Sequence, residues 1–208
     1  MSVGYQGDLF GAAAEPSLGR LRDTVQRTRL GRGAWVDVRR SWVSGADEVF
    51  AALAHRTPWR AERREMYDRV VDVPRLVHVY GGDEPLPHRL LTSARQALTN
   101  HYLPELGEPF VTAGCCYYRD GHDSVAWHGD RIGRGRTEDT MVAILSFGDP
   151  RRLLLRPEGG GASIAFTLGH GDLLVMGGSC QRTWEHCVPK VASAGPRVSV
   201  QFRPANVL

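Results

Sequence analysis

The pattern of apolar and polar positions changes near residue 110 of the chain. Before that point, apolar residues recur at helical spacing in two stretches, residues 42–56 and 85–103. Ser44 and Asp47 are both suited to cap the first of these helices. The pattern therefore predicts two amphipathic helices in the N-terminal half.

After residue 110, short apolar runs alternate with glycine-containing turns. The runs read "PFVTAGCCYY", "MVAILSFG", "RRLLLRP", "SIAFTLG", "DLLVMGG" and "RVSVQFR". Short strands at this spacing indicate a β-sandwich or barrel. We therefore predict an α+β fold that is mainly β. Residues 1–18 are expected to form a flexible tail, and residues 19–208 a single domain with its helices in 19–108 and its β core in 109–208.

Composition narrows the class of protein. Charged residues make up 24% of the chain and hydrophobic residues 42%, as in an ordinary soluble globular protein. No run is long enough to span a bilayer, and the N-terminus lacks the pattern of a signal peptide. Two of the four cysteines are adjacent, which fits a disulfide framework poorly. We expect a reduced, cytoplasmic and monomeric protein without membrane association.

The net charge of +3 weakly favours an anionic partner such as nucleic acid. All but one of the 26 basic residues are arginine, Lys190 being the exception. Such a bias often reflects the base composition of a gene. The number of arginines therefore indicates nothing about function, and only their positions are informative.

The tripeptide HGD occurs at residues 128–130 and again at 170–172. The second copy lies between two predicted strands, where glycine and aspartate favour a hairpin turn. The first copy ends a predicted strand and opens a loop rich in glycine and arginine. In an extended chain, His128 and Asp130 point to the same side. On its own this pair is more typical of a surface turn than of a metal site.

A third ligand is available at His186, 56 residues after Asp130. Two histidines and one carboxylate form the facial triad of non-haem Fe(II) sites, which leaves coordination positions open. Cys180 and Cys187 flank His186, but their spacing matches no common zinc pattern.

The final predicted strand, residues 197–203, alternates strictly. Its apolar positions are Val198, Val200 and Phe202, and its polar positions are Arg197, Ser199, Gln201 and Arg203. The polar face is either solvated or directed into the barrel. If it points inward, its two arginines require anions, and the guanidinium fork suits the carboxylates of a small dicarboxylate.

Several segments resemble the AlkB-like Fe(II)- and 2-oxoglutarate-dependent dioxygenases, which repair alkylated nucleic acid. They are "VPRLVHVYGGD", "CYYRDGHDSVAWHGD", "SFGDPRRLLLR", "GHGDLLVMGGSCQRTWEHCVPK" and "GPRVSVQFR", within residues 70–204. The resemblance rests on the combination of H-x-D, a distant His and R-x5-R, which is specific, whereas each motif alone is not. It implies a double-stranded β-helix (jelly-roll, cupin-like) core with flanking N-terminal helices, and Fe(II) and 2-oxoglutarate as cofactors.

By position, the resemblance makes His128, Asp130 and His186 the iron ligands. It places Arg197 at the distal carboxylate of 2-oxoglutarate and Arg203 near its keto-acid end. Tyr118 matches a tyrosine that hydrogen-bonds 2-oxoglutarate. Two positions depart from the family. Cys116 replaces a usual asparagine, and Ile132 and Gly133 stand where many members carry an acid facing the base, so that Glu138 or Asp139 would have to substitute.

The activity that the resemblance implies is oxidative demethylation of alkylated bases in DNA, with RNA as a second candidate substrate, which releases formaldehyde, succinate and CO2. Arg131, Arg134 and Arg136 form a basic loop suited to phosphates. Tyr80 is a further candidate for substrate contact. Trp59 and the basic residues after it, Arg60, Arg63 and Arg64, match the family's nucleotide-recognition lid.

Two alternatives stay open at this point. One is a 2-oxoglutarate-dependent hydroxylase of RNA or protein. The other is a non-catalytic nucleic-acid-binding module with a vestigial site. A separate feature is the peptide "QGDLF" in the tail, which resembles the motif that docks repair proteins on the DNA sliding clamp, with Gln6, Leu9 and Phe10 as contacts.

Overall fold

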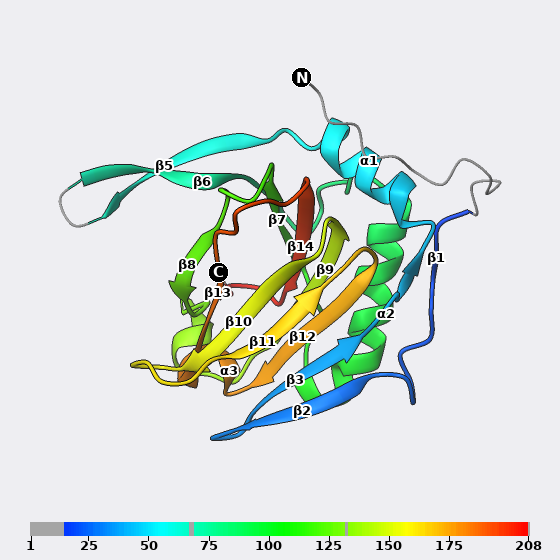
Figure 1. Ribbon diagram of the computed structural model, residues 1–208. Helices are drawn as coiled ribbons and strands as arrows, with labels where there is room; N and C mark the ends of the chain where they lie inside the picture. The colour runs from blue at the N-terminus through cyan, green and yellow to red at the C-terminus, as the bar shows by residue number, and fades with distance from the viewer. Residues whose placement is uncertain (1–14, 67–68, 132, 208) are drawn as a thin grey trace.

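A computed structural model of the protein describes residues 15–66, 69–131 and 133–207 (Figure 1). Most of the expected tail, including the clamp-like peptide at Gln6, Leu9 and Phe10, lies outside these residues. At the end of that expected tail, β1 (Ser17–Leu18) pairs with β4 (Val43–Ser44). No helix in the described part of the chain is long and apolar enough to cross a bilayer.

The strands of the C-terminal half form two facing antiparallel sheets. One contains β7, β9, β12 and β14, and the other contains β8, β10, β11 and β13. The sheet orders β12-β9-β14-β7 and β11-β10-β13-β8 are those of a jelly roll and agree with the predicted mainly β core. The bounds are β7 (Thr112–Tyr118), β8 (Val125–His128), β9 (Val142–Gly148), β10 (Arg151–Pro157), β11 (Ile164–Leu168), β12 (Asp172–Gly178), β13 (Trp184–Val188) and β14 (Arg197–Arg203).

The N-terminal half adds strands that the sequence pattern did not predict. β2 (Gln26–Gly31) and β3 (Ala34–Arg39) extend the first sheet beyond β12, and β5 (Arg60–Met66) and β6 (Arg69–Tyr80) extend it beyond β7. β2 is polar because it lies at the sheet edge, whereas β3 is almost wholly buried. Neither strand therefore shows the alternation of a half-exposed strand.

The two predicted helices are present as α1 (Ala46–Arg56) and α2 (Arg89–Leu106). The predicted caps of α1 are wrong. Gly45, with φ 64°, precedes the helix without a side-chain bond, and Asp47 lies inside the first turn. In α2, the ring of His88 accepts a hydrogen bond from the Leu90 amide at 3.1 Å.

The helices cover the outer face of the larger sheet, as Figure 1 shows for α2 behind β12 and β3. Val198, Val200 and Phe202 of β14 belong to this helix-facing core. Because side chains alternate along a strand, the arginine face of β14 points between the two sheets. The inward orientation is thus the one that the structure adopts.

Candidate active site

The first HGD copy meets His186 on neighbouring strands. His128 ends β8, and its Cα partner across the sheet is His186 of β13. The two imidazole centroids lie 4.2 Å apart. Asp130 follows immediately, and one potential ligand atom from each of these three residues lies within 4.8 Å of the others. The predicted triad is therefore assembled by strand pairing.

Neighbouring groups orient these ligand atoms. His128 Nδ1 lies 2.9 Å from the Ala126 carbonyl oxygen, and Nε2 lies 3.8 Å from Asp130 Oδ1. Arg203 donates from Nε and Nη2 to Asp130 Oδ2, both at 2.8 Å. These bonds leave His128 Nε2 and Asp130 Oδ1 directed at the same place, as a metal site requires.

The protonation states also suit a metal. Burial acts to raise the pKa of Asp130, but Arg203 and the two histidines outweigh it and lower the pKa to about 2. Burial, with a smaller contribution from His128, lowers the pKa of His186 to about 3. Metal ions bind the deprotonated forms. Two imidazoles and a carboxylate match the donor set of a non-haem Fe(II) site.

The second HGD copy is a turn, as predicted. Gly171 has φ +78°, a conformation that favours glycine. His170 Nδ1 accepts a hydrogen bond from the Gly148 amide at 2.8 Å. Asp172 accepts from the amides of Gly169 and Ser41 at 2.9 and 2.8 Å. These side chains organise the hairpin and lie outside the metal cluster.

A cavity of about 90 Å³ opens beside the triad, between the two sheets. Arg197 reaches it from β14 and is only 2% exposed. Its Nε donates to Ser146 Oγ at 2.9 Å, whereas Nη1 has no hydrogen-bond partner among the residues that the structure describes. A buried guanidinium without a carboxylate is costly, so this end of the cavity fits an anionic ligand.

Two further predicted cosubstrate contacts line the same cavity. Tyr118 is 3% exposed, and its ring centroid lies 5.1 Å from Arg197 Cζ. Burial raises the pKa of Tyr118 to about 12, so its hydroxyl is a donor at neutral pH. Cys116 is half-buried, with Sγ 3.9 Å from Gln201 Oε1. The Gln201 amide donates to Ser199 Oγ at 2.5 Å. Gln201 lines the cavity from β14, the strand that pairs with the strand of Cys116, β7.

The sequence reasoning missed several supporting residues. Gln181 of α3 (Cys180–Thr183) accepts the Asp130 amide at 3.1 Å. Ser146 holds Arg197, and Arg75 of β6 lines the cavity. A lone Gln, Ser or Arg carries no local signal of its role. Only the strand order brings these residues to the site.

The predicted substrate contact by Tyr80 is corrected by its position. Tyr80 is 6% exposed, belongs to the helix-facing core and packs edge-on against His78 at 4.4 Å. Its ring is therefore part of the packing and is not accessible to a nucleic acid. The local sequence could not distinguish a core aromatic from a surface one.

The basic loop is only partly available to a ligand. Arg131 pairs with Glu158, and Arg134 pairs with Glu108 and, at 3.5 Å, with Glu138. Arg136 ends the short 3-10 helix at Arg134–Arg136 and is exposed. Phosphate contacts by Arg131 and Arg134 would require exchange of these partners.

The two acids considered as substitutes for the acid that faces the base, Glu138 and Asp139, are both engaged in ion pairs. Glu138 pairs with Arg134, and Asp139 pairs with Arg182.

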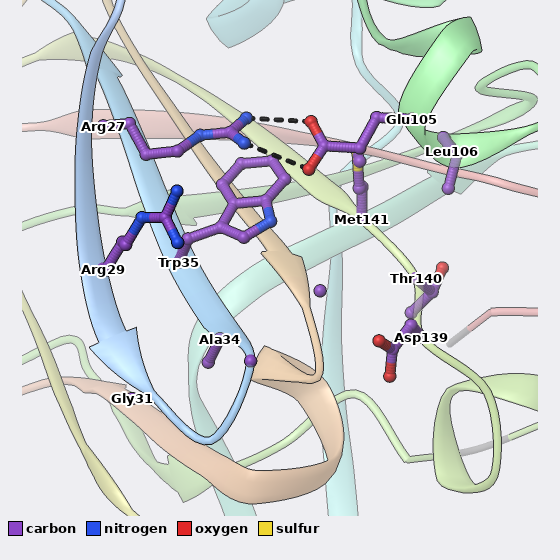
Figure 2. Close-up of a pocket in the computed structure, with 12 residues that line it drawn as sticks. Arg27, Arg29, Gly31, Ala34, Trp35, Glu105, Leu106, Asp139, Thr140 and Met141 are labelled. Atoms are coloured by element: carbon purple, nitrogen blue, oxygen red, sulfur yellow. Dashed lines mark hydrogen bonds and ion pairs between the residues drawn. The ribbon is translucent and has the colours of Figure 1, made fainter.

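A larger cavity of about 520 Å³ lies elsewhere, between the β2–β3 hairpin, the end of α2 and residues 139–141 (Figure 2). Figure 2 shows Arg27 directed at Glu105 beside the ring of Trp35. Arg27 Cζ lies 3.6 Å from the Trp35 centroid, and Asp37 also pairs with Arg27 at 2.7 Å. These charges are satisfied within the protein, and no triad residue lines this cavity.

Comparisons with known proteins agree with this geometry. The family model of the 2OG-Fe(II) oxygenase superfamily matches residues 78–203, a range that contains the triad. The chain is 34% identical over 178 residues to the bovine alpha-ketoglutarate-dependent dioxygenase alkB homolog 3. The matched region covers 76% of this chain and 61% of that protein. It thus spans about 60% of the length of that relative.

Two further matches are more limited. The Arabidopsis thaliana DNA oxidative demethylase ALKBH2 is 35% identical over 112 residues, or 41% of this chain and 35% of that protein. A 2OG-Fe(II) oxygenase family oxidoreductase from Burkholderia pseudomallei superposes with a TM-score of 0.58 at 12% identity, covering 82% of this chain and 87% of that one. The second match supports the fold alone.

Proposed function

Because the chain belongs to the 2OG-Fe(II) oxygenase superfamily, we propose that it is an Fe(II)- and 2-oxoglutarate-dependent dioxygenase that demethylates alkylated bases in DNA. The observation that carries the proposal is one cavity with the His128, Asp130 and His186 cluster at its mouth and the buried Arg197 within it, whose Nη1 has no hydrogen-bond partner among the described residues. The names of the bovine and Arabidopsis relatives support the same class of reaction.

In this proposal, His128 Nε2, Asp130 Oδ1 and His186 hold Fe(II), which supplies the activation of dioxygen. Arg203 keeps Asp130 ionised and fixes its free oxygen toward the metal. Arg197 Nη1 pairs with the distal carboxylate of 2-oxoglutarate, and the Tyr118 hydroxyl donates a hydrogen bond to the same ligand. The chain's part in the reaction is to fix the cosubstrate relative to the open coordination positions.

Apolar side chains also line the cavity and exclude bulk water from the reacting groups. They include Ile144, Leu153, Leu168 and Val188. Exclusion of water strengthens the pairing of Arg197 with a carboxylate and limits side reactions of an oxidant. The small volume leaves room for the cosubstrate, so the alkylated base has to approach from the open side.

The base would approach past His128, whose side chain is 38% exposed, compared with 6% for Asp130. The β5–β6 hairpin projects beyond the body of the protein in Figure 1, next to β7 in the sheet order, and is our candidate lid over a bound strand. Arg136 is the accessible arginine of the basic loop. A base in duplex DNA would first have to leave the stack, at a cost of about a few kcal/mol.

The test is mass spectrometry of single-stranded DNA that carries 1-methyladenine or 3-methylcytosine, incubated with the protein, Fe(II), 2-oxoglutarate and ascorbate. Loss of the methyl mass is expected with the wild type and with His170→Ala, but not with His128→Ala. An RNA oligonucleotide of the same sequence tests the preference for DNA. Turnover of 2-oxoglutarate to succinate without loss of methyl would retain the dioxygenase and reject the substrate.

Three further properties stay predictions. They are the cytoplasmic location, the monomeric state and the binding of the tail peptide to a sliding clamp. For the clamp, we expect a sliding clamp to retain the full chain in a pull-down and to lose the double variant with Leu9 and Phe10 changed to alanine. Retention of that variant would reject the contact.

A further inference from the structure

The four cysteines of the chain occupy two different environments. Cys115, Cys180 and Cys187 are buried, and burial raises the pKa of each thiol, to about 12 for Cys180. Cys116 is half-buried and lines the cavity beside the metal cluster. A small reagent that enters this cavity therefore meets one thiol only.

Strand geometry separates Cys116 from its neighbour in sequence. Cys115 and Cys116 are consecutive in β7, so their side chains point to opposite faces of the sheet. Cys115 belongs to the helix-facing core, whereas Cys116 packs against the core between the sheets. The two thiols are thus not placed to form a disulfide, and Cys116 is available for reaction with other molecules.

Two cations border Cys116. Arg75 and Arg197 line the same cavity, and each has a buried nitrogen without a hydrogen-bond partner in the described part of the chain, Nε of Arg75 and Nη1 of Arg197. Arg203, by contrast, is neutralised by Asp130. Burial acts to lower the pKa of Arg75, but the neighbouring Cys116 and Tyr118, with a small contribution from Glu62, raise it overall. The Cys116 sulfur therefore lies in a cavity that two guanidinium groups border.

We propose that Cys116 is a modification site, whose sulfur reacts with small electrophiles when the cavity is empty and is shielded when 2-oxoglutarate occupies it. With an alkyl halide, the sulfur gives its proton to solvent and forms an S–C bond, while the carbon–halogen bond breaks and halide leaves. The product is a neutral thioether. In a cavity of about 90 Å³, the added group takes the space needed by the cosubstrate.

The shielding depends on the proposed function, because it assumes that 2-oxoglutarate binds beside Arg197. The reactivity of Cys116 does not depend on it. Exposure, the two cations and the lining of the cavity are properties of the chain itself. The two parts can therefore be measured separately.

The experiment uses the full chain under anaerobic conditions with Fe(II), treated with a limiting amount of iodoacetamide. Peptide mass spectrometry follows carbamidomethylation at each cysteine. We expect Cys116 to be labelled well before Cys115, Cys180 and Cys187, and saturating 2-oxoglutarate to slow this labelling several-fold. Labelling of Cys116 at the rate of the buried three would overturn the proposal.

Matched variants separate electrostatics from mere access. Arg75→Met keeps an unbranched side chain at the site but removes the charge, and we expect slower labelling of Cys116. An unchanged rate would show that the site is only exposed, which contradicts the proposal. Cys116→Ser should lose the rapidly labelled site, whereas Cys115→Ser should be labelled at Cys116 at the rate of the wild type.

Calorimetric titration of 2-oxoglutarate into the same anaerobic sample distinguishes the two possible failures. If 2-oxoglutarate binds but leaves the labelling of Cys116 unchanged, the shielding is wrong while the proposed function stands. If 2-oxoglutarate does not bind, the proposed function fails. Rapid, selective labelling of Cys116 would then still identify a reactive thiol.

Discussion

Arg203 binds the oxygen of Asp130 that faces away from His128. Nε and Nη2 of the guanidinium both lie 2.8 Å from Oδ2, while Oδ1 lies 3.8 Å from His128 Nε2. Asp130 Oδ2 therefore pairs with a cation of the protein, and Oδ1 is left to bind a metal. Arg203 thus both balances the charge of Asp130 and orients its carboxylate.

Arg203→Met should remove both roles at once. Removing one partner of a buried ion pair leaves an uncompensated charge and costs about 3–5 kcal/mol in the free energy of unfolding. Loss of a group that orients a ligand should also weaken Fe(II) binding by about 10–100-fold. Urea unfolding and Fe(II) titration measure the two effects. Arg203→Lys keeps the charge and should lose less stability, and equal losses in both variants would contradict this account.

Arg197→Met should have the opposite effect on stability. Arg197 is buried and has no carboxylate partner within the described residues, so an apolar replacement should raise the free energy of unfolding of the ligand-free protein by ~1 kcal/mol. The same variant should bind 2-oxoglutarate at least about tenfold more weakly, because a charge-assisted bond is lost. Calorimetry and urea unfolding test both parts. Unchanged affinity for 2-oxoglutarate would exclude Arg197 as its partner.

The metal-free protein should lose stability as the pH falls from about 6.5 toward about 3. In the folded state burial lowers the pKa of His186 to about 3, whereas an unfolded histidine takes up its proton near pH ~6.5. The unfolded state therefore binds more protons in this range, and the contribution of His186 is complete only above it. Urea unfolding from about pH 7 to about pH 5 should show a steeper decline for the wild type than for His186→Asn. Equal slopes would contradict the burial effect.

Gly171→Ala tests the assignment of the second HGD copy as a turn. A Cβ at this positive φ would lie 2.4 Å from the Val43 carbonyl oxygen, so we expect a loss of about 2–3 kcal/mol with unchanged Fe(II) binding. The matched control is Gly159→Ala, at φ +84° but with nothing within 4 Å of the added atom. The control should cost only ~1 kcal/mol. Weaker Fe(II) binding in Gly171→Ala would overturn the assignment.

The sequence was most informative where spacing alone constrains geometry. Side chains an even number of residues apart in a strand share one face, so the spacing was enough to group His128 with Asp130 and Arg197 with Arg203. His186 needed the further condition that its strand pairs with β8, which the jelly-roll order supplies. The fold brings these residues together around a single cavity.

The parts that sequence reasoning missed depend on tertiary packing. β3 is almost wholly buried and β2 lies at an edge, so neither strand shows alternation. Tyr80 stayed a candidate for substrate contact because nothing local reveals that α1 and α2 cover its side of the sheet. Gln181 reaches the candidate metal ligand Asp130 only because α3 packs beside it, and a glutamine in a short helix has no distinguishing pattern.

The pairing that assembles the triad is also the weakest part of the smaller sheet. β8 is at the edge of that sheet and is bonded to β13 through a register shift, with His186 opposite His128 and Val188 opposite Val125. Two of the three ligands come from this edge segment, and the third comes from the strand inside it. An ion bound by all three would cross-link the edge strand to the rest of the sheet, so the metal would stabilise the sheet as well as take part in catalysis. Amide hydrogens of β8 should then exchange slowly with solvent when iron is bound and rapidly when it is removed.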